Sequence, residues 1–269
     1  MEGNGFRSPD LCWTVARRRL GEELLFLIAG WAEMLATGGR SLQWPSRDRE
    51  YHSYRCAVRR LQRAGLLAYR RTKGRDPMLR LLPEGRMRIP DELQPEKRWN
   101  EKWDGTWYVL AYDVPEKQKV YRDALRRFLK RNRMGGLQGS VWVSPRDIRP
   151  VYADLSEAAG VGSYAVLLQA HTVLGQQAQD VVRQAWDIDA IAAAQERYRT
   201  TTEAERERLH EGALSRVDLL SLARDELSAF LAVMADDPLL PSVLWPPEYR
   251  GPETVAAHRR FQRAIARLI

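Results

Sequence analysis

The segment that most restricts the fold of this chain is residues 106–113, in which all six positions from 107 to 112 are apolar. The two faces carry, in alternation, Trp107, Val109 and Ala111 on one side and Tyr108, Leu110 and Tyr112 on the other. Side chains of a strand point alternately to opposite faces, so this strand must be covered on both sides. We therefore expect a central strand, or one that packs at a dimer interface.

The residues after this strand predict one α+β domain. Apolar residues at helical spacing mark a helix from Tyr121 to Leu129, and the run LQGSVWVSP predicts a tight strand pair centred on Gly139. A short helix at 151–159 and a strand at 164–170 follow. The order is β-α-β-β-α-β, which is typical of a ferredoxin-like fold. We assign it to residues 104–175 and expect it to dimerise.

Residues 176–269 are predicted to form a mostly helical C-terminal domain. Apolar residues recur at helical spacing through 181–198, 204–234 and 255–269, and a proline-rich loop lies between the last two segments. Residues 150–269 carry 12 basic and 17 acidic side chains. This balance favours an effector or oligomerisation domain over a nucleic-acid surface.

The excess of positive charge lies in the first part of the chain. Residues 1–103 hold 21 Lys and Arg against 13 Asp and Glu, whereas residues 104–269 hold 22 of each sign. Within residues 51–88 the count is 11 basic against 2 acidic. Such density predicts contact with a phosphate backbone, and the alternative is a solvated basic face without a partner.

Residues 1–90 are predicted to form a winged-helix DNA-binding domain, followed by a linker over 91–103. Leu20 to Leu35 and a segment beginning near Tyr51 have helical spacing, and the second has one apolar and one basic face. Two short strands, 66–70 and 78–82, then surround a turn, which is the order of a recognition helix and its wing. Gly38, Gly39 and Pro45 interrupt the region where a second helix of the helix-turn-helix is expected.

This arrangement nominates ten residues for contact with double-stranded DNA. The helix contributes basic side chains for the major groove, and the wing contributes side chains for phosphates; the alternatives are helix solvation, capping and packing. The helix residues are Tyr51, His52, Ser53, Arg55, Arg59 and Arg63. The wing residues are Arg70, Arg71, Lys73 and Arg75.

Several protein classes are not supported by the sequence. Two Cys and four scattered His offer no metal-ligand spacing or disulfide framework, and no GxSxG, P-loop, GxGxxG or HExxH motif is present. The N-terminus lacks the pattern of a secretory signal, and the most apolar stretch is too short for a membrane span. We expect a cytoplasmic protein that is not an enzyme, with no catalytic, metal or cofactor site and no membrane partner.

Three segments of the sequence resemble the PaaX family of bacterial repressors. They are YHSYRCAVRRLQRAGLLAYRRTKGR, the long run WDGTWYVLAYDVPEKQKVYRDALRRFLKRNRMGGLQGSVWVSPRD, and DPLLPSVLWPPEYRGPE preceded by WDIDAIAAAQERY. The resemblance implies a winged helix, a middle domain similar to the small CRISPR spacer-acquisition subunit, and a helical C-terminal domain. It also implies a homodimer that represses a catabolic operon and is released by an acyl-CoA thioester, whose binding residues remain unknown. For such a ligand, the candidate phosphate-binding residues are Arg122, Arg126, Arg146 and Arg149.

Two other functions remain open at this point. One is a non-specific DNA-binding or CRISPR-associated adaptor, which the interrupted helix-turn-helix favours. The other is a metal-dependent nuclease, because the resemblance aligns Asp113 with an acidic residue proposed to hold a divalent cation across the dimer. A structural role for Asp113, as a hydrogen-bond acceptor at the N-terminus of the following helix, is the competing interpretation.

Overall fold

The structure is a computed structural model that describes residues 59, 61–70, 78–87, 89–159, 161–173, 175–209 and 214–268. The chain divides into two compact units. We call the first the central unit; its described residues are those of 95–192 and 236–249. We call the second the helical unit; its described residues are those of 59–94, 193–235 and 250–268. Each unit is therefore built from separate stretches of chain.

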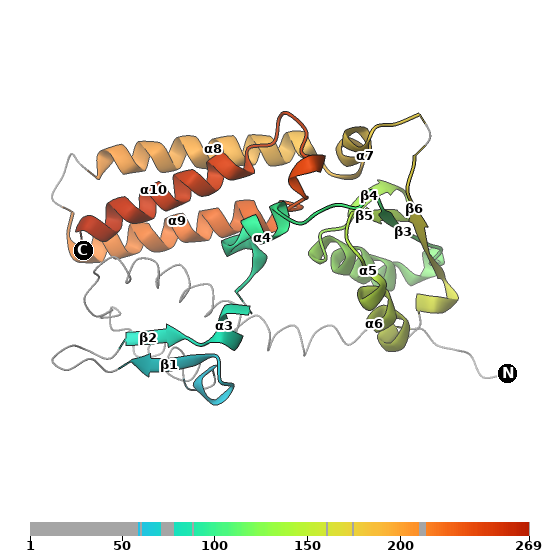
Figure 1. The fold of residues 1–269 in the computed structure, drawn as a ribbon, viewed down its shortest axis with the longest axis horizontal. Helices are drawn as coiled ribbons and strands as arrows, with labels where there is room; N and C mark the ends of the chain where they lie inside the picture. Colours follow the sequence, from blue (N-terminus) through green and yellow to red (C-terminus); the bar gives the residue numbers. More distant parts are fainter. Residues whose placement is uncertain are drawn as a thin grey trace. The chain divides into compact units, whose positions relative to one another are not determined.

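The central unit has the predicted β-α-β-β-α-β order (Figure 1). The sheet has the strand order β4-β5-β3-β6, and all neighbouring strands are antiparallel. This order puts the first strand of the domain in the interior of the sheet, as its two apolar faces predict. The elements are β3 (Trp107–Tyr112), α5 (Lys119–Arg131), β4 (Gly135–Gln138), β5 (Val141–Ser144), α6 (Arg149–Ala159) and β6 (Ala165–Ala170).

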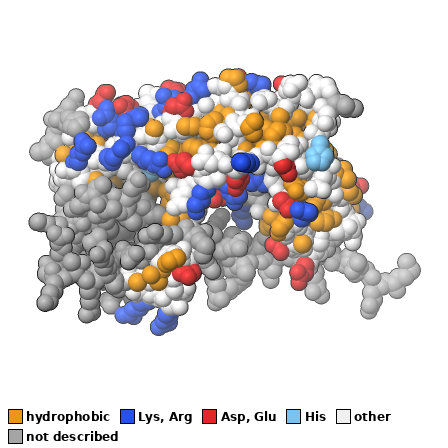
Figure 2. Space-filling view, viewed as in Figure 1, with side chains coloured by type: hydrophobic (Ala, Val, Ile, Leu, Met, Phe, Trp, Pro, Cys, Tyr) orange, Lys and Arg blue, Asp and Glu red, His pale blue; other side chains and the backbone are white. Residues whose placement is uncertain are grey.

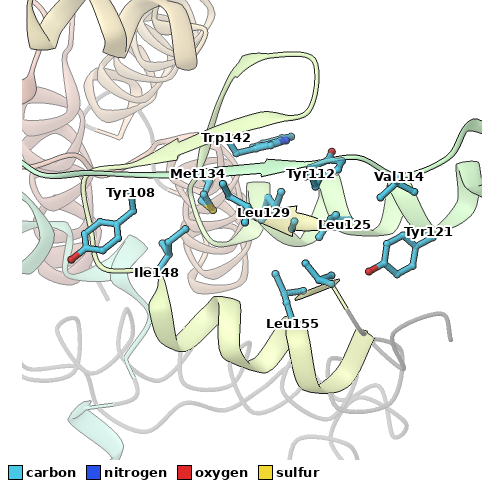
Figure 3. Packing of buried hydrophobic residues seen from close by; sticks show 13 residues of the cluster. Tyr108, Tyr112, Val114, Tyr121, Leu125, Leu129, Met134, Trp142, Ile148 and Leu155 are labelled. Atoms are coloured by element: carbon cyan, nitrogen blue, oxygen red, sulfur yellow. The ribbon is translucent and has the colours of Figure 1, made fainter. Parts of the chain in front are cut away.

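One face of the sheet packs on α5 and α6. Tyr108, Leu110 and Tyr112 project from β3 into a buried cluster. Helix α5 contributes Tyr121, Leu125 and Leu129, which are spaced by four residues and so lie on one side of the helix. Figure 3 shows these side chains converging with Met134, Trp142 and Leu155.

The other face of the sheet is covered by elements that follow the domain in sequence. Trp107 and Val143 pack against Val181 and Val182 of α7 (Ala178–Ala185). Leu240 and Leu244 complete this cluster, and Leu244 ends the short 3-10 helix η4 (Ser242–Leu244). The sheet is therefore enclosed partly by residues that lie about 70 to 130 positions downstream of β3.

Gly135 in β4 allows α7 to approach the sheet. A Cβ at this position would lie 2.6 Å from the Trp186 ring and 2.7 Å from the Ala185 Cβ, closer than real Cβ contacts allow. The neighbouring Gly136 has no such restriction, since its nearest contact would be 3.9 Å from Trp142. Only glycine at position 135 is thus compatible with this packing.

The segment expected to be a linker is ordered in the structure. Residues 91–103 include the 3-10 helix η1 (Asp91–Leu93) and helix α4 (Pro95–Trp99). Trp99 is buried, and its ring meets the rings of Trp245 and Tyr249 edge to face at centroid distances of 5.5 and 6.3 Å. The second half of this segment therefore belongs to the core of the central unit.

Residues 236–249 are held in the central unit by polar contacts as well as apolar ones. The Asp237 carboxylate is fully buried and accepts hydrogen bonds from the Leu239 backbone N–H, at 2.7 Å, and from the Tyr249 hydroxyl. Arg133 and Arg146 donate to backbone carbonyls of this segment, at Asp237 and Leu239 respectively. We call residues 236–249 the strap.

The helical unit contains three long helices, α8 (Ile188–Arg208), α9 (Arg216–Asp236) and α10 (Gly251–Leu268), which lie side by side in Figure 1. Phe230 and Met234 of α9 and Phe261 and Ile265 of α10 are almost fully buried. The helical spacing predicted over 181–198 corresponds to two helices, α7 and the start of α8, rather than one. None of the helices in the described residues has the length and apolar character that a membrane span requires.

The described N-terminal residues contain the predicted strand pair. Strands β1 (Leu67–Arg70) and β2 (Met78–Leu81) are antiparallel, with Leu67 opposite Leu81 and Arg70 opposite Met78. A short helix, α3 (Pro83–Met87), follows. The helix predicted over residues 20–35 lies outside the described residues.

Candidate functional site

The end of the predicted recognition helix carries two exposed arginines. Residues 59 and 61–63 are helical, Arg59 and Arg63 are exposed, and Leu61 is buried. Gly65 ends the helix at φ +71°, a conformation that glycine adopts without strain, and its N–H bonds to the Gln62 carbonyl. The arginines are four residues apart, so they lie on the same side of the helix.

Only three residues, 64–66, separate this helix from β1 of the hairpin. The Leu66 N–H donates to the Leu61 carbonyl, and the Leu82 N–H donates to the Leu66 carbonyl. Arg70 is the last residue of β1. The remaining predicted DNA contacts lie outside the described residues: Tyr51, His52, Ser53, Arg55, Arg71, Lys73 and Arg75.

Asp113 does not have the helix-capping role that was the competing interpretation. Helix α5 begins at Lys119, with Gln118 in the cap position, so Asp113 lies well before its first turn. Its backbone N–H donates to the Tyr164 carbonyl, while its side chain is exposed. Within the described part of the chain, no group of three or more His, Cys, Asp or Glu side chains is placed to hold a metal ion.

The four arginines considered for binding CoA phosphates are not equivalent. Arg146 is occupied within the central unit: it pairs with Glu101 at 2.5 Å and bonds to strap carbonyls, and burial lowers its pKa. Arg149 forms a two-pronged pair with the neighbouring Asp147. Arg126 is exposed and Arg122 is half-buried. Arg146 therefore stabilises the fold rather than offering a free cation.

Residues 150–269 include a basic surface that the net charge of this stretch conceals. Arg260, Arg263 and Arg267 are exposed along α10. In the face drawn in Figure 2, Lys and Arg side chains gather at the end of the bundle where α10 terminates. The count of 17 acidic against 12 basic residues over 150–269 thus averages over faces of different sign.

A buried polar cluster lies among α8, α9 and α10. The Glu226 side chain is 5% exposed and the His258 side chain 6%. Glu226 Oε1 lies 2.7 Å from His258 Nδ1 and also accepts a hydrogen bond from the Tyr198 hydroxyl. The His258 ring stacks on Phe230 at a centroid distance of 3.8 Å. Burial, together with the Glu226 charge, raises the pKa of Tyr198, so the phenol stays a neutral donor.

The sheet, its two helices and α7 correspond to a known family domain. Residues 100–182 match the profile of the PaaX protein central Cas2-like domain. The chain therefore contains a PaaX central Cas2-like domain. A PaaX domain is typical of transcriptional regulators.

The PaaX match begins just after α4 and ends within α7, so it includes α5, α6 and the first part of α7 but not the strap. Among solved structures, the uncharacterized protein Rv0674 from Mycobacterium tuberculosis is similar, with 22% sequence identity, 81% of this chain and 82% of that chain covered, and a TM-score of 0.49. No protein of curated function matched at a significant level. The assignment of the PaaX central domain rests on the profile match over residues 100–182.

The sequence alone does not identify the buried cluster of Tyr198, Glu226 and His258. A signal was present, because Glu226 lies three residues after Ala223 and four before Phe230, in the apolar stripe of α9. His258 has the same place in α10, between Val255 and Phe261. An ionisable residue within an apolar stripe predicts a buried partner, but spacing within one helix does not identify which residue that partner is.

Proposed function

We propose that the protein is a transcriptional repressor that binds double-stranded DNA through its N-terminal region. The observation that carries this proposal is the pair of exposed arginines, Arg59 and Arg63, on a helix that is followed closely by an antiparallel hairpin. A basic helix followed by a hairpin suits a winged helix, in which the helix enters the major groove and the hairpin contacts the backbone. The density of basic residues over 51–88 supports the same surface.

The remaining parts of the proposal follow from the PaaX resemblance. The protein acts in the cytoplasm as a homodimer, represses a catabolic operon, and leaves its operator when an acyl-CoA thioester binds. A two-fold symmetric dimer matches a palindromic operator, and its symmetry sets the spacing of the half-sites.

The dimer surface is proposed to include the exposed side of β6. Val166 and Leu168 are 57% and 52% exposed, although both are large apolar residues. They are two positions apart and hence lie on one face of an edge strand. An apolar edge strand is a favourable place for a second chain to pack.

The test of the function is fluorescence anisotropy with the intergenic DNA upstream of the gene and a scrambled duplex, each at two salt concentrations. A repressor is expected to prefer the upstream DNA by about 10³-fold or more, and phenylacetyl-CoA is expected to release it. Equal, salt-sensitive binding to both duplexes would instead identify a non-specific DNA-binding protein.

The dimer surface is tested by the double substitution Val166→Asp and Leu168→Asp. Burying two carboxylates in an apolar interface is unfavourable, so we expect the dimer dissociation constant to rise by about 100-fold. Light scattering after size exclusion should then report 31.0 kDa in place of twice that mass. Val120→Asp is the matched control, since Val120 is an exposed apolar residue (77%) that belongs to α5 and not to β6. An unchanged mass for the double variant, or an equal change in the control, contradicts the assignment.

A further inference from the structure

The helical unit contains a cavity of about 420 Å³ above the buried polar cluster. Residues of α8, α9 and α10 line it, and these three helices run alongside one another in Figure 1. Its apolar wall includes Leu222, Ala229, Val233 and Phe261. The volume is within the range of small-molecule sites, which are mostly apolar with a few polar anchors.

One polar anchor of this cavity has an unused hydrogen-bonding position. Glu226 lines the cavity and is nine-tenths buried. Its Oε1 atom accepts from Tyr198 and faces His258, whereas its Oε2 atom is buried and has no hydrogen-bond partner among the described residues. A buried carboxylate oxygen without a donor is costly, so a donor supplied by a ligand would be strongly favoured there.

The charges around the cavity indicate the sign of that ligand. Three carboxylates, those of Glu205, Asp225 and Glu226, line it. Glu205 is paired with Arg208 at 2.9 Å, which leaves Asp225 and Glu226 against the guanidinium of Arg197. This excess of negative charge attracts a cation and repels an anion. Phosphates of a CoA thioester are therefore disfavoured in this cavity, which must take a different ligand from the effector proposed above.

We propose that this cavity binds a small amphipathic amine, with its apolar body against Phe261 and Val233 and its ammonium group directed to Glu226. A charge-assisted N–H donor satisfies the Oε2 atom, and the apolar body fills the space between the helices. The Tyr198 hydroxyl and His258 hold the carboxylate in place before the ligand arrives. The site lies within one unit and does not depend on the DNA-binding proposal.

The test is isothermal titration of the full chain, without DNA, with three matched probes: 4-phenylbutylamine, 4-phenylbutanol and 4-phenylbutyrate. They share one apolar body and differ in the charge of the end group. The amine is expected to bind at least about 10-fold more tightly than the alcohol, because a hydrogen bond to a charged group contributes more than a neutral one. The carboxylate is expected to bind least.

Two substitutions localise the binding. Glu226→Gln keeps an oxygen acceptor for Tyr198 but removes the charge, and is expected to weaken amine binding by about 10- to 100-fold while sparing the alcohol. Ala229→Phe fills the cavity without changing any charge and should weaken both the amine and the alcohol. The control is Glu207→Gln, which removes an exposed carboxylate of α8 outside the cavity and should change nothing.

The outcomes distinguish binding in the cavity from a general attraction of cations to the protein surface. Loss of amine selectivity in Glu226→Gln, together with weaker binding of both the amine and the alcohol in Ala229→Phe, supports the proposal. The second variant still tests the site if the first folds poorly. Tighter binding of 4-phenylbutyrate than of the amine overturns it. Amine binding that both variants leave unchanged, or no binding of any probe up to about 10 mM, overturns it equally.

Discussion

Replacing Arg59 and Arg63 together by Ala is expected to weaken binding to the upstream duplex by about 100-fold at about 0.1 M salt. Each arginine that contacts DNA contributes roughly 1.4 kcal/mol, and the two are exposed on the same side of the helix. If both contact phosphates, the slope of log affinity against log salt should fall by about 2. If one reads a base, discrimination between the upstream and scrambled duplexes should fall as well.

The measurement is anisotropy over a salt series, with Arg126→Ala/Arg127→Ala as the control. These two exposed arginines of α5 carry the same total charge but lie in the central unit. A loss of affinity in the control equal to that of the Arg59/Arg63 variant would mean that net charge alone drives binding. The recognition-helix proposal would then have to be abandoned.

Asp237→Ala is expected to destabilise the protein by about 3 kcal/mol, the largest effect on stability that we predict. The substitution leaves the buried Tyr249 hydroxyl and the Leu239 N–H without their acceptor. Leu239 also has φ +48°, a conformation that a non-glycine residue keeps only when its surroundings hold it. Burial, and then the Asp237 charge, raise the pKa of Tyr249, so this phenol is a neutral donor at physiological pH.

Thermal unfolding provides the measurement. At about 2–4 °C per kcal/mol for a chain of this size, the midpoint of Asp237→Ala should fall by about 6–12 °C. Asp236→Ala is the adjacent control, since Asp236 is exposed and its loss should change the midpoint by no more than about 1–2 °C. Equal shifts in the two variants would show that the hydrogen bonds of the strap do not hold it in place.

The order of elements in the central unit could be predicted because each has a strong local signal. The strand around Val109 is apolar on both faces, and apolar residues recur every four positions in the helix around Leu125. Gly139 marks the turn of the hairpin. These patterns depend on neighbours within a few positions of each other. They do not depend on the rest of the chain.

The elements that could not be predicted depend on contacts between distant residues. The packing of Leu240 and Leu244 on the sheet and the burial of Trp99 join segments far apart in sequence. Similarly, Glu226 and His258 are 32 positions apart, and only the packing of α9 on α10 brings them together. The spacing of apolar residues within one helix or strand predicts which of its faces is buried. It does not predict which other element packs on that face.

The strap also bears on how such a chain can be rearranged during evolution. The region that matches the PaaX domain, 100–182, is continuous in the gene, but the cluster around Trp107 is completed by Leu240 and Leu244. Recombination that transferred only the matched region would carry a sheet with one face partly uncovered. The inheritable unit is therefore longer than the recognisable domain, and the helices between Ile188 and Asp236 have to be inherited with it.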